Sequence, residues 1–181
     1  MLSNMNNDNG YSYCAGTLPY AFYNNSVYIL MGKNKNGRLC SFSGKNEDSE
    51  TIVETACREM WEETCGVVMS KTDILKHLGE DCIVLESQTP RGKKCYIMMF
   101  EIPYRKWYAP AFIRMQDSLK SIVKSHGGDV GKYTEMVDIK WISIDSFCTN
   151  VRRSWDNNKM SLSNSEWCKV HDLKRKARCQ H

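Results

Sequence analysis

The chain has 181 residues, of which 41% are hydrophobic and 25% charged, and its formal net charge is +4. These values exclude a disordered, collagen-like or membrane-embedded chain and predict a single folded domain over residues 1–181 with a core of its own. No apolar stretch approaches the roughly 20 residues that a bilayer span needs. The first ten residues are too polar for a signal peptide, so we expect an intracellular, cytoplasmic protein without membrane contact.

The first half of the chain predicts strands followed by one helix. After a polar leader over about residues 1–15, the segments 18–23 and 26–31 are rich in aromatic and β-branched residues, and 38–43 is a shorter strand candidate. Residues 50–64 contain neither proline nor glycine and repeat apolar positions every three or four residues, which is the helical period. We expect that helix to end at Gly66.

The second half mixes the same two kinds of element. Segments 81–87 and 95–102 predict two strands, 111–125 predicts a helix, and 136–144 predicts a further strand. A last helix with a basic tail is expected over about residues 163–181. Because strands and helices mix without regular alternation, linker or repeat, the sequence favours one α/β sandwich.

Nine cysteines suggest a disulfide framework at first, but their number is odd, their spacing is wide, no secretory signal accompanies them and no C-x-x-C pair occurs. The four histidines are not spaced as zinc ligands beside any cysteine pair. We therefore expect free thiols and no structural zinc.

The predicted helix 50–64 carries an unusual group of acids. At about 100° per residue, Glu59, Glu62 and Glu63 share one face, beside an apolar face that can pack on a sheet. No lysine is interspersed to relieve their repulsion. Clustered carboxylates without thiolate or imidazole partners are the ligand set of Mg²⁺ or Mn²⁺, and Mg²⁺ commonly shares its shell with substrate phosphates. The alternative is an acidic surface cluster that binds nothing.

The wider spacing around these acids resembles the signature of the Nudix hydrolases. Six residues match that signature in register over twenty positions: Gly44, Glu50, Arg58, Glu59, Glu62 and Glu63. The resemblance covers most of the chain, and it implies a Nudix-type α/β/α sandwich with a mixed central sheet. It also implies hydrolysis of a phosphoanhydride in a nucleoside diphosphate linked to another group, such as a nucleoside triphosphate or a dinucleoside polyphosphate.

The resemblance further implies roles for individual side chains. Glu59, Glu62 and Glu63 would be metal ligands, and Glu59 is also a candidate to orient or deprotonate the attacking water. Arg58 would pair with Glu50 or a neighbouring carboxylate and hold the helix against the glycine loop.

Two further parts of the site are expected from the same resemblance. Ser43 and Gly44 would offer backbone contacts at the metal. A general base would come from the later acidic segment, where Glu135 is preferred to Asp138; alternatively, both are ordinary residues at a strand edge.

Two departures from the family pattern concern the loops beside the acids. Cys65 stands where the family has glycine, and Gly66 follows one residue late. We expect Cys65 to add one helical residue and Gly66 to form a left-handed cap. Ser43 stands where a second glycine is common, which adds a Cβ at a place of close approach.

Substrate recognition is less sharply indicated. The basic residues Arg38, Arg91, Lys93 and Lys94 are candidates to bind phosphates, and a second basic cluster occupies 174–178; both basic segments are alternatively a solvated loop and tail. Candidate base-stacking residues are Phe22, Tyr104, Trp107 and Tyr108, unless they belong to the core. The functional alternatives are an mRNA-decapping Nudix enzyme that binds RNA, and a Nudix ligand-binding module that has lost catalysis. Loss of catalysis usually replaces a helix carboxylate, and none is replaced here.

Overall fold

The computed structural model describes residues 12–47, 49–79, 82–88, 92–129, 131, 134–149 and 164–178. The strands in these ranges are β1 (Cys14–Thr17), β2 (Tyr20–Tyr23), β3 (Ser26–Asn34), β4 (Leu39–Cys40), β5 (Phe42–Lys45), β6 (Ile83–Gln88), β7 (Lys94–Met99) and β8 (Met136–Ser143). The longer helices are α1 (Ile52–Glu63), α2 (Lys71–Gly79), α3 (Tyr108–Ser125) and α5 (Asn164–Arg178). A short helical segment at 144–149 follows β8. None of the helices in the described part is long and apolar enough to cross a bilayer.

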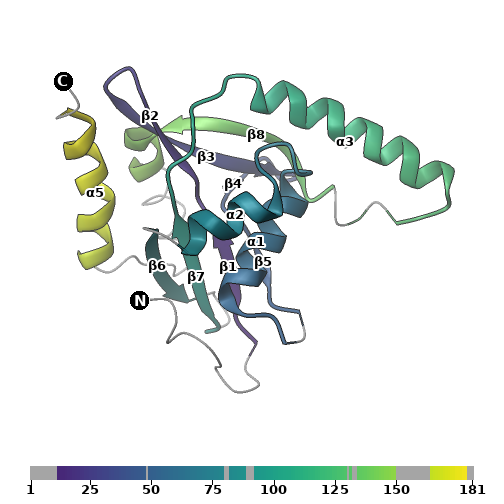
Figure 1. The fold of residues 1–181 in the computed structure, drawn as a ribbon, viewed down its shortest axis with the longest axis horizontal. Coiled ribbons are helices and arrows are strands. Elements are labelled where there is room, and N and C mark those ends of the chain that lie inside the picture. Colours follow the sequence, from purple (N-terminus) through teal and green to yellow (C-terminus); the bar gives the residue numbers. More distant parts are fainter. Residues whose placement is uncertain are drawn as a thin grey trace.

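The strands form two four-stranded sheets (Figure 1). One has the order β5-β1-β7-β6, in which β1 and β7 are parallel and the other pairs antiparallel. The other joins β2, β3 and β4 and adds β8 along β3, and all of its pairs are antiparallel. The predicted mixed α/β fold is confirmed, with the strands divided between two sheets.

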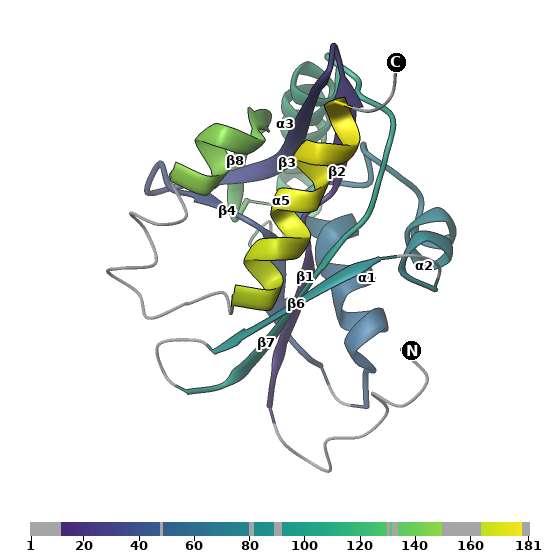
Figure 2. The ribbon, with the colours of Figure 1, turned by 90° about the vertical axis from the view of Figure 1, so that its left-hand side faces the viewer.

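Helices cover both sides of these strands (Figures 1 and 2). On one side, Met60 of α1, Leu78 of α2 and Phe112 of α3 belong to one buried cluster. On the other side, Val170 and Leu173 of α5 belong to a second cluster, together with strand residues. The two clusters are the two layers of core that an α/β/α arrangement requires.

Several boundaries differ from those that the sequence predicts. β1 starts at Cys14, inside the predicted leader, because Ala15 and Thr17 are fully buried between two neighbouring strands. The predicted strand 38–43 is two strands, β4 and β5, which belong to different sheets. The helix α2 was not predicted, since only Ile74 and Leu78 mark its buried face. Most of the predicted leader (1–11) and the end of the basic tail (179–181) lie outside the described residues.

The helix α1 begins with a capping box. Thr51 accepts from the Glu54 backbone N–H through Oγ1 (3.2 Å), and the Glu54 carboxylate accepts from the Thr51 backbone N–H (2.8 Å). This reciprocal pair satisfies two amide groups that have no partner within the helix. It fixes the first turn, and thereby the rotation of the acidic face three turns later.

The end of α1 corrects the expectation for Cys65. The helix ends at Glu63, and Cys65 adopts a left-handed φ of 52° instead of continuing the helix. Gly66 is left-handed as predicted, with φ at 66°, and its N–H donates to the Trp61 carbonyl (2.8 Å). A Cβ added to Gly66 would stand only 2.9 Å from Nε1 of the Trp61 ring, which is too close. Two consecutive left-handed residues thus turn the chain under the Trp61 ring, and the buried Cys65 side chain offsets part of the backbone cost.

This geometry predicts the order of stability of two variants at position 65. Both Cys65→Gly and Cys65→Ala remove the buried thiol, but only glycine also relieves the left-handed strain. We expect the glycine variant to unfold with a free energy about 1 kcal/mol higher than the alanine variant. Urea unfolding of the two proteins measures this difference. If Cys65 were helical, alanine would instead be the more stable of the two.

Candidate active site

Glu63 lies at the C-terminal end of α1 and is only 5% exposed. Burial raises its pKa to about 9, and the nearby charges of Glu59, Glu135 and Glu62 act in the same direction against a hydrogen bond from the Ser43 backbone. Within the described chain its Oε2 atom has no hydrogen-bond partner. A buried carboxylate oxygen without a partner is costly to a fold unless a ligand compensates it.

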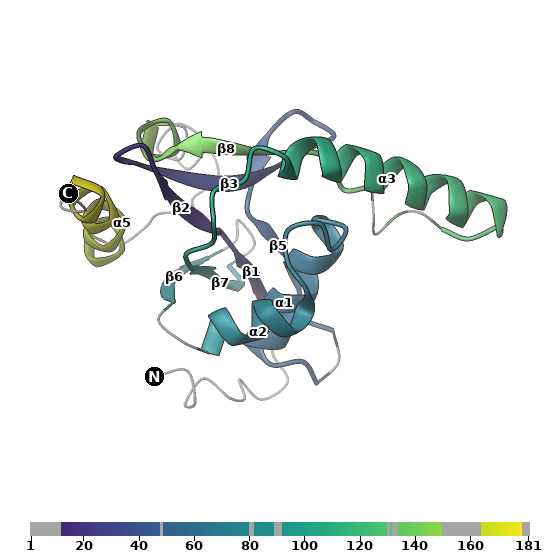
Figure 3. The ribbon, with the colours of Figure 1, turned by 45° about the horizontal axis from the view of Figure 1, so that its top comes forward.

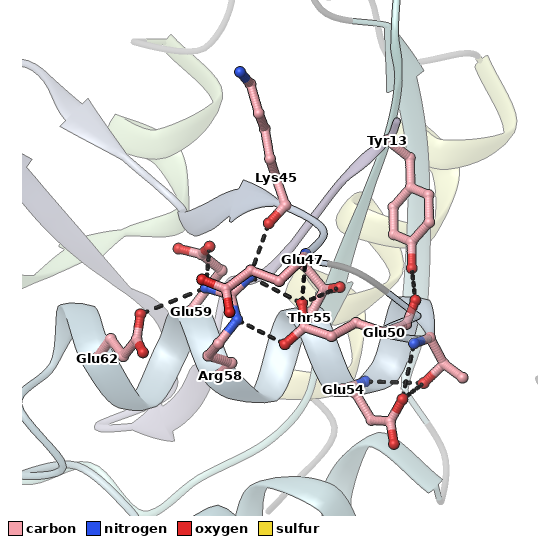
Figure 4. Close-up of polar contacts among 10 residues, drawn as sticks. Tyr13, Lys45, Glu47, Glu50, Glu54, Thr55, Arg58, Glu59 and Glu62 are labelled. Carbon is pink, nitrogen blue, oxygen red and sulfur yellow. Dashed lines mark hydrogen bonds and ion pairs between the residues drawn. The ribbon is translucent and has the colours of Figure 1, made fainter. Parts of the chain in front are cut away.

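Glu59 lies one turn earlier and is also buried. Burial raises its pKa, partly offset by Arg58, whose Nη1 lies 2.6 Å from Glu59 Oε1 (Figure 4). The same guanidinium nitrogen lies 3.4 Å from an oxygen of Glu62. Arg58 thus forms ion pairs with two of the three helix acids, Glu59 and Glu62.

The other side of Arg58 is bound to Glu50 (Figure 4). Arg58 Nε lies 2.7 Å from Glu50 Oε1, and Nη2 lies 3.0 Å from Oε2. Burial would raise the pKa of Glu50, but these hydrogen bonds outweigh it and lower that pKa. Nη2 also donates to the Lys45 carbonyl at 2.8 Å. Arg58 therefore ties α1 to the end of β5, in the pairing that the sequence analysis anticipates.

Gly44 is required by this packing. A Cβ at Gly44 would stand 2.3 Å from Glu59 Oε1, so the carboxylate occupies the space that the missing side chain leaves. Ser43 keeps its Cβ because Gly16 faces it across β1 and β5. A Cβ on Gly16 would stand 2.2 Å from the Ser43 Cβ. Gly16 therefore compensates for Ser43, and sequence reasoning missed it because the two residues are far apart in the chain.

Glu135 approaches the helix acids from the sheet that contains β8. It is exposed, stands directly before β8, and its charge raises the pKa of both Glu59 and Glu63. Cys40 of β4 is in the same neighbourhood: burial raises the pKa of its thiol to about 12, with contributions from Glu63 and then Glu135. The structure thus brings Glu135 to the acidic face of α1, whereas its role as a base stays a prediction.

The sequence analysis also missed Gln116, which lies on the buried face of α3 and is 3% exposed. Its Nε2 donates to the Met136 carbonyl at 2.6 Å, and its Oε1 accepts from Lys120 at 2.7 Å. The residue thereby fixes the backbone immediately after Glu135. A glutamine one helical turn after Phe112, on an otherwise apolar face, is the signal that could have indicated it.

The candidate phosphate-binding residues occupy two places. Arg38 is exposed on the turn between β3 and β4, where Lys35 of the same turn donates to Thr134 Oγ1 (3.3 Å), beside Glu135. Lys93 donates to Ser12 (2.8 Å), and Lys94 is exposed at the start of β7. Arg91 lies outside the described residues.

Most of the candidate stacking residues are used in packing. Tyr104 stacks on Tyr23 with ring centroids 4.2 Å apart, and Tyr108 is buried. Phe22 packs edge-on against Tyr20. Of the four candidates, only Trp107 is mainly exposed, at 52%.

The donor set suits a hard divalent cation. The three helix acids supply carboxylate oxygens, Glu63 Oε2 is buried without a partner, and Gly44 brings backbone close to Glu59. As the side chains lie, no three Asp, Glu, His or Cys residues in the described ranges are placed to hold one ion. Arg58 binds Glu59 and Glu62 in this arrangement. A bound cation would therefore compete with Arg58 for these two carboxylates. Glu63 is not bound by Arg58 and would be free of that competition.

No family model and no curated protein matches this sequence. Among solved structures, it is similar to an Ap4A hydrolase of C. elegans in a binary complex, with 12% identity, 77% of this chain and 86% of that chain covered, and a TM-score of 0.49. It is also similar to the NUDIX domain of Shewanella oneidensis NrtR complexed with ADP ribose, with 11% identity, 91% and 86% covered, and a TM-score of 0.48. A MutT/nudix family protein from Enterococcus faecalis matches with 16% identity, 76% and 45% covered, and a TM-score of 0.45.

The raised pKa of Glu63 predicts a pH dependence of stability. A carboxyl whose folded-state pKa is about 9 keeps a proton that the unfolded chain releases above about 4.5. Its contribution to stability is therefore present below pH 4.5 and is lost as the pH rises toward 9, by at most about 1.4 kcal/mol per pH unit. Glu63→Gln cannot ionise, so the metal-free variant should become increasingly more stable than wild type over this range, as measured by urea unfolding.

The control for this prediction is Glu54→Gln on the same helix. Hydrogen bonds from Thr51 lower the pKa of Glu54, so this group titrates below the window in question. Its unfolding free energy should run parallel to that of wild type. A Glu63→Gln curve that also runs parallel would show that Glu63 is not held in a desolvated site.

The Arg58–Glu50 pair predicts strong coupling between two substitutions. Arg58→Ala leaves Glu50 with an unpaired charge, and Glu50→Gln removes the partner of the Arg58 Nε group. We expect each to lower the free energy of unfolding by more than 1 kcal/mol, since Arg58→Ala leaves the Glu50 charge without its partner and Glu50→Gln leaves a largely buried Arg58 with fewer anionic partners. The double variant should be no less stable than Arg58→Ala. Additive losses in urea unfolding would show that the two side chains act separately.

Proposed function

We propose that this chain is a Nudix-type hydrolase that acts on a nucleoside diphosphate linked to another group. The finer proposal is a Mg²⁺- or Mn²⁺-dependent cleavage of a phosphoanhydride in a nucleoside triphosphate or a dinucleoside polyphosphate. The observation that carries the proposal is the buried Glu63 Oε2, which lacks a partner among the described residues and lies on the helix that bears the complete acidic motif.

In this proposal the side chains of α1 divide two tasks between them. Glu63, Glu59 and Glu62 hold the cation, which neutralises charge on the phosphates and on the transition state. Arg58 and Glu50 keep α1 against the end of β5, so that the carboxylates stay in register. Arg58 acts through Glu59 and is a positioning residue.

The proton of the attacking water has two candidate acceptors. Glu135 is exposed, and its charge raises the pKa of both buried acids, Glu59 and Glu63. It can therefore accept a proton from water at the edge of the acidic face. Glu59 is the alternative. Gln116 supports the first choice, because its hydrogen bond to the Met136 carbonyl fixes the backbone next to Glu135.

RNA stays in consideration as a substrate because of the position of Lys93. Lys93 stands directly before β7 and Lys94 is its first residue, so two adjacent basic side chains there are candidates to bind phosphates. Capped RNA therefore belongs in the substrate panel, beside nucleoside triphosphates, dinucleoside polyphosphates and nucleotide sugars.

The test is to incubate the protein with Mg²⁺ or Mn²⁺ and this panel, and to identify the products by mass. We expect cleavage of a phosphoanhydride that requires the cation, and a loss of at least about 100-fold in kcat for Glu63→Gln, because a hard anionic ligand is replaced by a neutral one. Glu54→Gln, on the same helix but in the capping box, should keep wild-type turnover.

Two outcomes would contradict the proposal. Full turnover by Glu63→Gln at saturating Mg²⁺ would remove Glu63 from the cation site. Binding of a nucleotide without any product would favour a ligand-binding module instead.

Selective loss of activity on capped RNA in the double variant Lys93→Ala/Lys94→Ala, with a smaller salt dependence of binding, would identify RNA as the substrate.

A further inference from the structure

One face of α3 is largely apolar and mostly exposed in the described chain. At 100° per residue, five residues fall within a narrow arc that starts at the N-cap: Trp107, Ala111, Met115, Ser118 and Ile122. We name them the α3 stripe. Trp107, Met115 and Ile122 are 52%, 43% and 57% exposed. Three exposed large apolar side chains aligned on one helix face, separated by the smaller Ala111 and Ser118, are typical of an interaction surface.

The stripe is accessible to another molecule. The C-terminal half of α3 extends beyond the sheets, whereas its N-terminal half packs on β8 (Figures 1 and 3). Beside the stripe lies a groove of about 390 Å³, lined by Val67 and Arg114 together with four stripe residues. A second helix can therefore lie along α3 without meeting the body of the protein on the far half.

The order of side-chain sizes along the stripe is the same in both directions. Large residues stand at its ends (Trp107 and Ile122), small ones stand next (Ala111 and Ser118), and Met115 lies at the centre, with Arg114 beside it on the flank. A two-fold axis through the midpoint of residues 114 and 115 therefore places large residues opposite large ones and small residues opposite small ones. The small positions let two helix axes approach closely, to about 8–10 Å. A surface that is complementary to itself is what an isologous dimer requires.

The charges beside the stripe fit the same arrangement. Arg114 and Asp117 lie on one flank of α3, and neither has an ion-pair partner within the described residues. In an antiparallel pair of helices, equal flanks face each other. Arg114 of each copy then lies within reach of Asp117 of the other, which gives two reciprocal ion pairs.

We propose that the α3 stripe is the interface of a homodimer in which the two α3 helices pack antiparallel about a two-fold axis near residues 114 and 115. The stripe is about 22 Å long at 1.5 Å per residue, so the contact is small beside the roughly 800 Å² per partner of a standard stable interface. The dimer is therefore weak and depends on protein concentration. The second copy's Ile122 lies opposite Trp107, next to the groove.

The first test is sedimentation velocity of the full chain over a wide concentration range. Wild type should pass from monomer to dimer, and Ile122→Asp should weaken association by about tenfold or more, since a charge would be buried without a partner. Ile113→Asp is the matched control. Ile113 is 40% exposed on the opposite side of the same helix, and its variant should associate like wild type.

The second test uses the flanking charges to distinguish the antiparallel arrangement from any other. Arg114→Asp and Asp117→Arg should each weaken the dimer, because each places like charges opposite one another. The double variant restores both reciprocal pairs and should associate like wild type. A protein that stays monomeric at every concentration would overturn the proposal, as would a dimer unaffected by Ile122→Asp or a double variant as weak as the single ones.

Discussion

The interaction on which the site depends is a single guanidinium shared among buried carboxylates. Arg58 binds Glu50, Glu59 and Glu62 and also reaches the Lys45 carbonyl, so one side chain fixes both the acid face of α1 and the strand end beside it. These contacts are strong because they are largely shielded from water. Glu63 is the exception: it is buried on the same helix, and Arg58 does not bind it.

Close approach of backbone segments is the second condition of this site. Gly44 leaves room for the Glu59 carboxylate, and Gly16 leaves room for Ser43. The second pair shows how an added Cβ on one strand is tolerated when the facing residue on the neighbouring strand loses its own. The same exchange fails at Cys65, where no neighbour can relieve a positive φ and the backbone bears the cost.

The helix α3 connects the site with the surface of the molecule. Its buried face carries Gln116, which holds the start of β8 beside Glu135, and its exposed face carries the α3 stripe. A partner packed on the stripe would stabilise the helix that supports the Glu135 backbone.

The sequence by itself determined what depends on neighbours along the chain. The helical period placed Glu59, Glu62 and Glu63 on one face, and the spacing from Gly44 to Glu63 resembles the Nudix signature, from which the chemistry is proposed. Tertiary structure alone decided the burial of Glu63, the approach of Glu135 and the pairing of Gly16 with Ser43, because each joins segments far apart in sequence. Burial also decided which aromatic residues remain exposed, since a ring is equally suited to a core and to stacking. Desolvation and close contact arise only when distant strands pack together, and no local pattern encodes them.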